Sequence, residues 1–151
     1  MSKTAEEKLI EYMEEQRLDA VFISKHENVR YISSYTGDDS YLVLDRKVKR
    51  FFITDPRYTE QASIECPDYI PVEWRKEFGS VPKAVAGIAG REGYLRLGYE
   101  GDTVVVAFFN EMTENSGFEG VDIQGAVEKL RSKKTPEEIE YARIACDITC
   151  R

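Results

Sequence analysis

Short apolar runs separated by polar segments dominate the first half of the chain. Three of them are rich in Val, Ile, Leu, Phe and Tyr and are bounded by polar or turn-forming residues, which is typical of buried β-strands. They are residues 20–24, 41–44 and 51–54. Only the polar segment 45–49 separates the second run from the third, a length typical of a hairpin. We therefore predict three strands, of which the last two pair antiparallel.

Helix starts are marked by residues whose side chains can accept hydrogen bonds from the first free amides of a helix. The candidates are Thr4, Asn28, Asp55, Ser80 and Thr135. Thr4 and Thr135 are each followed three residues later by glutamate, which is the capping-box pattern. Pro56 and Pro136 suit the first helical position. The predicted helices begin at these caps and end near Arg17, near Ile32, before Pro67, at Gly90 and at Arg151.

In three further segments, apolar and polar residues alternate or β-branched residues occur, as is typical of strands. They are residues 69–74, 94–98 and 120–124. Pro71 places the first of them at a sheet edge or bulge, because proline cannot donate to a strand ladder. Residues 102–112 fit two patterns: their β-branched residues favour a strand, whereas Val105, Phe108 and Met112 recur at helical spacing after Thr103.

Alternating strands and helices with one hairpin predict an α/β fold with a mixed sheet covered on both faces. The 151 residues suffice for one domain with a sizeable core. Gly87, Gly90 and Gly93 follow a helix rather than a strand, so they indicate a helix end and turn and not a phosphate-binding loop.

The charge balance limits the possible partners. Twenty-eight acidic residues against 21 basic ones give a net charge of −7, which argues against a nucleic-acid partner, since each phosphate contact needs a cation. The basic runs 46–50 and 131–134 are interpreted as a solvated turn and a linker. No run reaches the roughly 18 apolar residues of a membrane span, and the first residues lack the apolar segment of a signal peptide. We expect a cytoplasmic protein.

The cysteines favour neither disulfides nor a metal site. Cys66, Cys146 and Cys150 are an odd number, which does not suit a disulfide framework. Cys146 and Cys150 share a face of the last predicted helix, but the sequence offers no second pair of ligands for a metal.

Candidate catalytic groups are sparse. His26 is the only histidine, and a single histidine beside a strand end is more often structural than catalytic, although its titration range keeps acid–base chemistry open. Four carboxylates lie near predicted strand ends: Asp38, Asp39, Asp45 and Asp55. Such groups can hold magnesium in two-metal sites, but turn and helix-cap roles explain each of them without a metal. We favour the structural interpretation.

Two groups of motifs resemble one known family. The first contains Asn-Val-Arg-Tyr-Ile at 28–32, Thr-Gly at 36–37, Tyr-Leu-Val-Leu at 41–44 and Thr-Asp-Pro-Arg-Tyr-Thr-Glu-Gln-Ala at 54–62. In this order they resemble the N-terminal domain of the creatinase/prolidase group, and within it bacterial Xaa-Pro aminopeptidases and dipeptidases. The second, residues 130–140, resembles the linker and first helix that lead into the catalytic domain of those enzymes. Together they span nearly the whole chain.

The resemblance implies a fold and a domain organisation. The expected fold has three α/β/α layers and a mixed sheet of five or six strands with one antiparallel member, as in ribonuclease H-like domains. Residues 1–129 would form the N-terminal domain, and 130–151 the linker and the start of a helix leading to an absent catalytic domain. The resemblance also favours a helix for residues 102–112. The abrupt end of the last helix suggests a truncated chain.

The same resemblance implies a function for the parent protein. In the family, a C-terminal domain holds two metal ions, usually manganese, through two Asp, one His and two Glu, and hydrolyses proline-containing peptides. None of those ligand motifs occurs here, so we expect this chain to bind no cofactor and to lack activity, while its parent is a metallopeptidase. The expected partners are a second copy in a homodimer and the parent's own catalytic domain.

Two sets of residues are singled out by the resemblance. An exposed loop is expected to line the partner subunit's active site; it comprises Tyr35, Thr36, Gly37, Asp38, Asp39 and Ser40. A structural role is expected for Asn28, Arg30, Tyr31, Asp55, Arg57 and Tyr58. The alternative function is a catalytically inactive protein-binding module of the same fold, whose acidic surface would suit a basic partner such as a histone. The gene sequence beyond codon 151 would discriminate between the two.

Overall fold

The structure, a computed structural model, describes residues 3–150. Within them, six strands form one mixed sheet in the order β4-β3-β2-β1-β5-β6. The strands are β1 Ala20–Ile23, β2 Ser40–Asp45, β3 Arg50–Thr54, β4 Ile70–Glu73, β5 Arg96–Tyr99 and β6 Glu119–Asp122. β2 pairs antiparallel with β1 and β3, whereas the pairs β1–β5, β5–β6 and β3–β4 are parallel. The predicted mixed sheet with one antiparallel member is confirmed.

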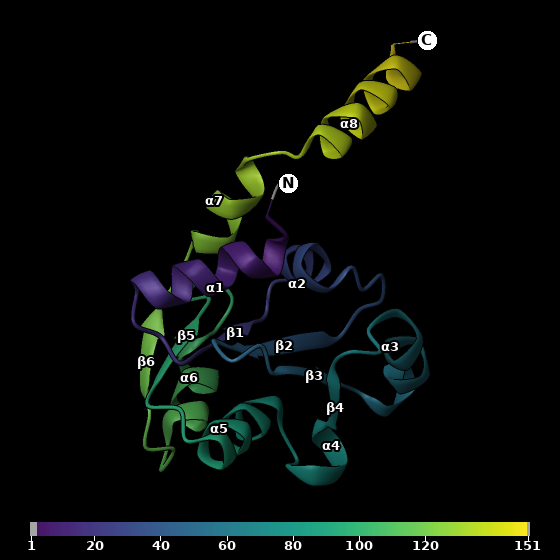
Figure 1. Cartoon of the computed structure of the whole chain (residues 1–151). Coiled ribbons are helices and arrows are strands. Elements are labelled where there is room, and N and C mark those ends of the chain that lie inside the picture. The colour runs from purple at the N-terminus through teal and green to yellow at the C-terminus, as the bar shows by residue number, and fades with distance from the viewer. Residues whose placement is uncertain (1–2, 151) are drawn as a thin grey trace.

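Helices cover both faces of the sheet and give three layers (Figure 1). The helices are α1 Ala5–Glu15, α2 His26–Ser33, α3 Thr59–Glu65, α4 Trp74–Glu77, α5 Val81–Glu92, α6 Val106–Thr113, α7 Ala126–Ser132 and α8 Pro136–Thr149. A 3₁₀ turn at Pro56–Tyr58 precedes α3. α1, α2 and α7 lie on one face, and α5 and α6 on the other (Figure 1).

The alternation of side chains along β1 divides the core into two halves, because successive residues of a strand point to opposite faces. Phe22 packs with Ile88 of α5 and Met112 of α6. Val21 belongs to the other half, with Leu9 and Met13 of α1. All four residues of β1 are buried, as expected for a central strand covered on both faces.

Local capping patterns predicted several helix ends correctly. Thr4 and Thr135 each form the predicted capping box. Asp55 accepts from the amide of Arg57 at 3.1 Å and so caps the 3₁₀ turn that Pro56 begins. Pro71 lies on the edge strand β4, as predicted.

Other helix ends differ from the predictions. α2 begins at His26 with Lys25 as N-cap, and the side chain of Asn28 does not cap it. α5 continues past Gly90 and ends at Gly93, whose φ of 73° is the left-handed conformation that glycine adopts without strain. α6 starts only at Val106, because Thr103 hydrogen-bonds back to the carbonyl of Glu100 in a turn.

Two helices and one boundary complete the comparison. The sequence patterns contained no prediction for α4 or for α7. The proposed domain boundary between residues 129 and 130 falls within α7, and the division of the parent protein stays a prediction.

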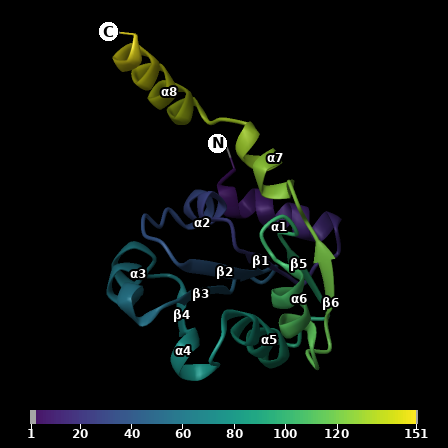
Figure 2. The same cartoon turned by 180° about the vertical axis from the view of Figure 1, so that it is seen from behind.

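α8 extends away from the domain in both views (Figure 1, Figure 2) and has no buried residue. Arg151, the predicted end of this helix, lies outside the described residues.

Asp55 connects the end of β3 to two arginines. Its side chain is 5% exposed. One oxygen accepts from Arg57 Nε at 2.8 Å, and the other lies 2.6 Å from Arg75 Nε, just beyond β4. The hydrogen bonds from Arg57 hold the pKa of the Asp55 carboxyl below its ordinary value. The predicted structural role of Asp55 thus has a physical basis in the cap and in the two ion pairs.

Replacing Asp55 by alanine should lower Tm by at least about 2 °C, because the cap and both ion pairs are lost. A thermal melt followed by circular dichroism measures this. Asp68→Ala is the matched control, since the described residues give that exposed aspartate no side-chain hydrogen bond. Equal melting of the Asp55→Ala variant and wild type would show that the cap does not stabilise the domain.

Alanine substitutions at two glycines inside α5 should change the stability of the domain in opposite directions. A Cβ on Gly87 would lie 2.3 Å from the ring of Phe78, whereas a Cβ on Gly90 would meet no atom within 4 Å. Gly87→Ala should therefore lower the free energy of unfolding by about 1 kcal/mol or more through overpacking. Gly90→Ala should raise it by about 0.5–1 kcal/mol through helix propensity. Urea denaturation of both variants tests the packing, and a stabilised Gly87→Ala would contradict it.

Candidate functional site

The candidate site lies at the edge of the sheet where the parallel strands β1, β3 and β5 end. Because β2 runs antiparallel to its neighbours, the segment that precedes it emerges at this same edge. Four segments that are distant in sequence therefore meet here: the starts of α2 and β2, the turn after β3, and the turn after β5. In open α/β sheets, ligands bind outside the carboxyl ends of the strands.

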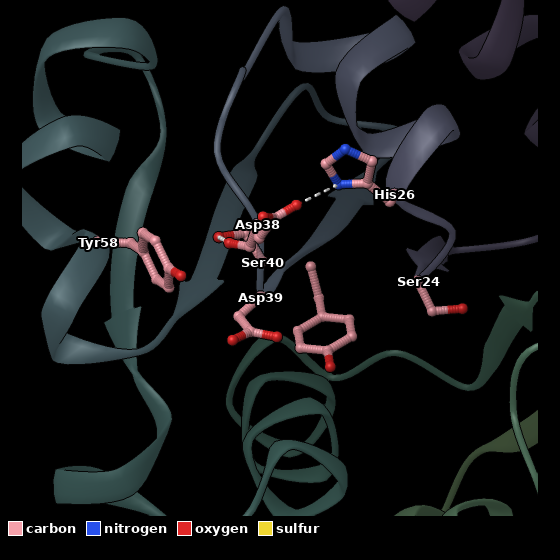
Figure 3. Close-up of a pocket in the computed structure, with 7 residues that line it drawn as sticks. Ser24, His26, Asp38, Asp39, Ser40 and Tyr58 are labelled. Atoms are coloured by element: carbon pink, nitrogen blue, oxygen red, sulfur yellow. Dashed lines mark hydrogen bonds and ion pairs between the residues drawn. The ribbon is translucent and has the colours of Figure 1, made fainter.

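A cavity of about 400 Å³ opens between three of these segments. Its lining consists of Ser24, His26, Asp38, Asp39, Ser40, Tyr41 and Tyr58. Figure 3 shows Asp38 and His26 facing each other, with Tyr58 on the opposite side. Three residues of the predicted loop and one of the predicted structural motif thus gather at one place.

Two carboxylates dominate the mouth of the cavity. The side chains of Asp38 and Asp39 are 77% and 62% exposed. Asp38 lies 3.6 Å from His26 Nδ1, and Asp39 lies 3.4 Å from a terminal nitrogen of Arg57. Because both contacts are long and open to solvent, each carboxylate keeps most of its capacity to attract a cation. We call residues 36–39 the anionic loop.

The anionic loop is held firmly at its first residue. The amide and hydroxyl of Thr36 donate to the Glu65 carboxylate of α3 at 2.7 and 2.8 Å. Gln61 donates to the same carboxylate, and these hydrogen bonds lower the pKa of Glu65. A loop attached in this way presents its side chains from a fixed position.

The ends of the predicted loop are buried, which corrects the expectation that all of residues 35–40 are exposed. The ring of Tyr35 packs edge-on against Phe52 with 4.8 Å between centroids, and it is fully buried. Ser40 belongs to β2 and its hydroxyl lies 3.0 Å from that of Thr54. A Cβ on Gly37 would lie 2.4 Å from the Tyr35 hydroxyl, so the loop can pass over this ring only with glycine there.

The predicted structural motif divides between two places. Asp55, Arg57 and Tyr58 lie beside the cavity, and Arg57 joins buried Asp55 to exposed Asp39. Asn28 is fully buried in α2 and does not line the cavity. Arg30 is exposed and Tyr31 half-buried on α2, and neither lines the cavity.

Sequence patterns did not identify Ser24, Tyr41 or Arg75 as neighbours of the site. Each occupies an ordinary position at a strand end or the start of a short helix, so no local signal distinguishes it. His26 was predicted to have a hydrogen-bonded structural role. Its Nδ1 lies 3.6 Å from an oxygen of Asp38, beyond hydrogen-bonding distance, so that role stays a prediction.

The described residues do not fit a metal centre. Within residues 3–150, no three His, Cys, Asp or Glu side chains gather in a way that could hold a metal ion. The pair of manganese ions that the resemblance implies for the parent stays a prediction. Likewise, within the same range no helix combines the length and apolar character needed to cross a bilayer.

Comparisons with known proteins agree with this fold. The family model described as Creatinase/Prolidase N-terminal domain matches residues 7–133. An uncharacterised peptidase of Bacillus subtilis, YqhT, is 34% identical over 93% of this chain and 40% of its own length. An Xaa-Pro dipeptidase of Pyrococcus furiosus is 30% identical over 94% of this chain and 38% of its own. The chain thus spans about two fifths of the length of these relatives.

Solved structures give the same result. The Xaa-Pro dipeptidase from Bacillus anthracis superposes with a TM-score of 0.80 at 31% identity, covering 90% of this chain and 37% of that protein. The N-terminal domain of the cytoplasmic peptidase PepQ from Mycobacterium tuberculosis has a TM-score of 0.76 at 32% identity, covering 85% of this chain and 99% of that one. The chain therefore belongs to the creatinase/prolidase N-terminal domain family.

Proposed function

We propose that this chain is the non-catalytic N-terminal domain of a metal-dependent Xaa-Pro peptidase. Its relatives of known activity are Xaa-Pro dipeptidases, and the chain matches only 38% of the length of each. The C-terminal part of such a protein would bind the metal ions, which activate water and polarise the scissile carbonyl. Proline-containing peptides in the cytoplasm would be the substrates of the parent.

We further propose that the anionic loop borders the active-site mouth of the partner subunit in a homodimer. The observation that carries this proposal is the pair of exposed carboxylates, Asp38 and Asp39, held by the Thr36–Glu65 hydrogen bonds beside the 400 Å³ cavity. A peptide substrate carries a cationic N-terminal amine, which two fixed carboxylates would attract. Rigidly anchored loops are the usual place for such contacts.

A protein-binding module remains the second candidate. Its support is the net charge of −7, which would favour a basic protein partner. A gene that continues with the two Asp, one His and two Glu of the expected metal site would favour the peptidase proposal. A gene that ends or continues without them would favour the binding module.

The purified 151-residue chain should not hydrolyse Xaa-Pro dipeptides, with or without manganese, because its described residues form no metal site. Product formation measured by chromatography should equal that of a protein-free blank. An Xaa-Pro dipeptidase assayed in parallel serves as the positive control. Turnover that survives repurification of this chain would refute its non-catalytic role.

In the full-length parent, the double substitution Asp38→Ala and Asp39→Ala should raise KM for an Xaa-Pro dipeptide about tenfold, since each lost carboxylate weakens attraction of the amine by roughly 0.5–1 kcal/mol. Steady-state kinetics at low salt measures this. The control replaces the adjacent exposed pair Glu14 and Glu15 on α1 by alanine, which changes net charge equally. A persistent dimer with wild-type kinetic constants in the loop variant would show that the loop only connects α2 to β2.

A further inference from the structure

A buried polar cluster joins α7 to the start of α2. It comprises Lys25, Asn28, Glu100, Glu128 and Arg131, from three segments of the chain: the start of α2, the turn after β5, and α7. Asn28 is 0% exposed and Glu100 only 2%. A buried amide or carboxylate is costly unless its hydrogen bonds are satisfied, so the geometry of this cluster constrains the segments that contribute to it.

Glu100 fixes the first turn of α2. One of its oxygens accepts from the amides of Ser24 and Lys25, each at 2.7 Å. Its other oxygen accepts from the side-chain amide of Asn28. The carboxylate from the end of β5 thus satisfies donors at the start of α2, where the helix dipole favours a negative charge.

Asn28 then connects this turn to α7. Its side-chain nitrogen donates to Glu128 at 3.0 Å, in addition to Glu100, and its side-chain oxygen accepts from Arg131 at 2.9 Å. The side-chain nitrogen of Asn28 therefore donates twice and its side-chain oxygen accepts once within the protein. Two of its three partners lie on successive turns of α7.

Lys25 makes a second connection. Its ammonium lies 2.6 Å from Glu128 and also contacts Asp102, and these contacts raise the pKa of Lys25. Burial alone would raise the pKa of Glu128, but hydrogen bonds from Lys25 and Asn28 outweigh it and leave that pKa lowered. The charged forms of both residues are thus favoured at neutral pH.

Apolar contacts alone attach α7 weakly. Val127 is its only fully buried residue, with Ala126 and Leu130 packed at the margin of the core. A short helix with few buried apolar contacts opens locally at low free-energy cost. The polar contacts of Asn28 and Lys25 therefore contribute a large share of its attachment.

We propose that Asn28 and Lys25 are positioning residues that lock α7 to the first turn of α2. His26, between them, carries the contact to Asp38 in the anionic loop. The turn thus contacts the loop on one side through this long, exposed pair, and on the other side it holds the helix that leads into α8 (Figure 1). The lock is a property of this domain by itself; its consequence, a fixed offset between the first turn of α2 and the segment after α7, matters for catalysis only under the function proposed above.

Hydrogen–deuterium exchange of the 151-residue chain tests the lock. In Asn28→Ala, amides of α7 should exchange at least about tenfold faster, while amides of the hairpin β2–β3 keep wild-type rates. Asn110→Ala is the matched control, because Asn110 is an exposed asparagine on α6. Wild-type exchange in α7 of a folded Asn28→Ala variant would overturn the proposal.

A second variant keeps the test decisive if Asn28→Ala does not fold. Arg131→Met retains an aliphatic stem on α7 and removes only the donor to Asn28, so α7 amides should again exchange faster. Arg143→Met on α8 is its control, since that arginine is 75% exposed. Unchanged exchange in Arg131→Met would refute the lock. Neither measurement needs substrate or metal, so failure here leaves the loop proposal intact, and failure of the loop proposal leaves the lock intact.

Discussion

The direction of β2 determines where the chemistry of this domain can occur. Five strands run one way, and β2 between β1 and β3 runs the other. α2 and the anionic loop therefore stay at the edge where β1, β3 and β5 end, and do not cross the sheet. A parallel β2 would start at the opposite edge and separate Asp38 from His26 by the length of a strand.

That edge contains two kinds of polar group with different physical roles. Asp55, Asn28 and Glu100 are at least 97% buried and are paired with arginines, amides or backbone donors. Asp38 and Asp39 are exposed and only loosely paired. The buried groups support the backbone, and the exposed ones are available to a partner. An exposed acidic loop and a buried framework thus occupy one edge, and Arg57 contacts both of them.

Local sequence motifs correctly predicted those features of the fold that depend only on residues adjacent in the chain. The capping boxes at Thr4 and Thr135 and the Asp55–Pro56 turn need only a few adjacent positions. Asn28 was predicted to be a helix cap because asparagine at the start of a helical segment often caps it. Its actual partners, Glu100 and Arg131, are distant in sequence. Gly90 and Gly93 look alike in the sequence, and only the backbone conformation shows which one ends α5. The cavity likewise unites residues whose proximity follows from strand order, which single-sequence patterns do not encode.

The strand order also sets the sequence in which the sheet can assemble as the chain leaves the ribosome. β1 to β4 are four adjacent strands of the six-stranded sheet, with the local hairpin β2–β3 at their centre. β1 receives its other neighbour only when β5 arrives, because Ala20 pairs with Leu97. Until then, a wholly apolar strand presents a free edge, the kind of surface that pairs with foreign strands. β1 therefore keeps one unpaired edge until residues 96–99 have been synthesised.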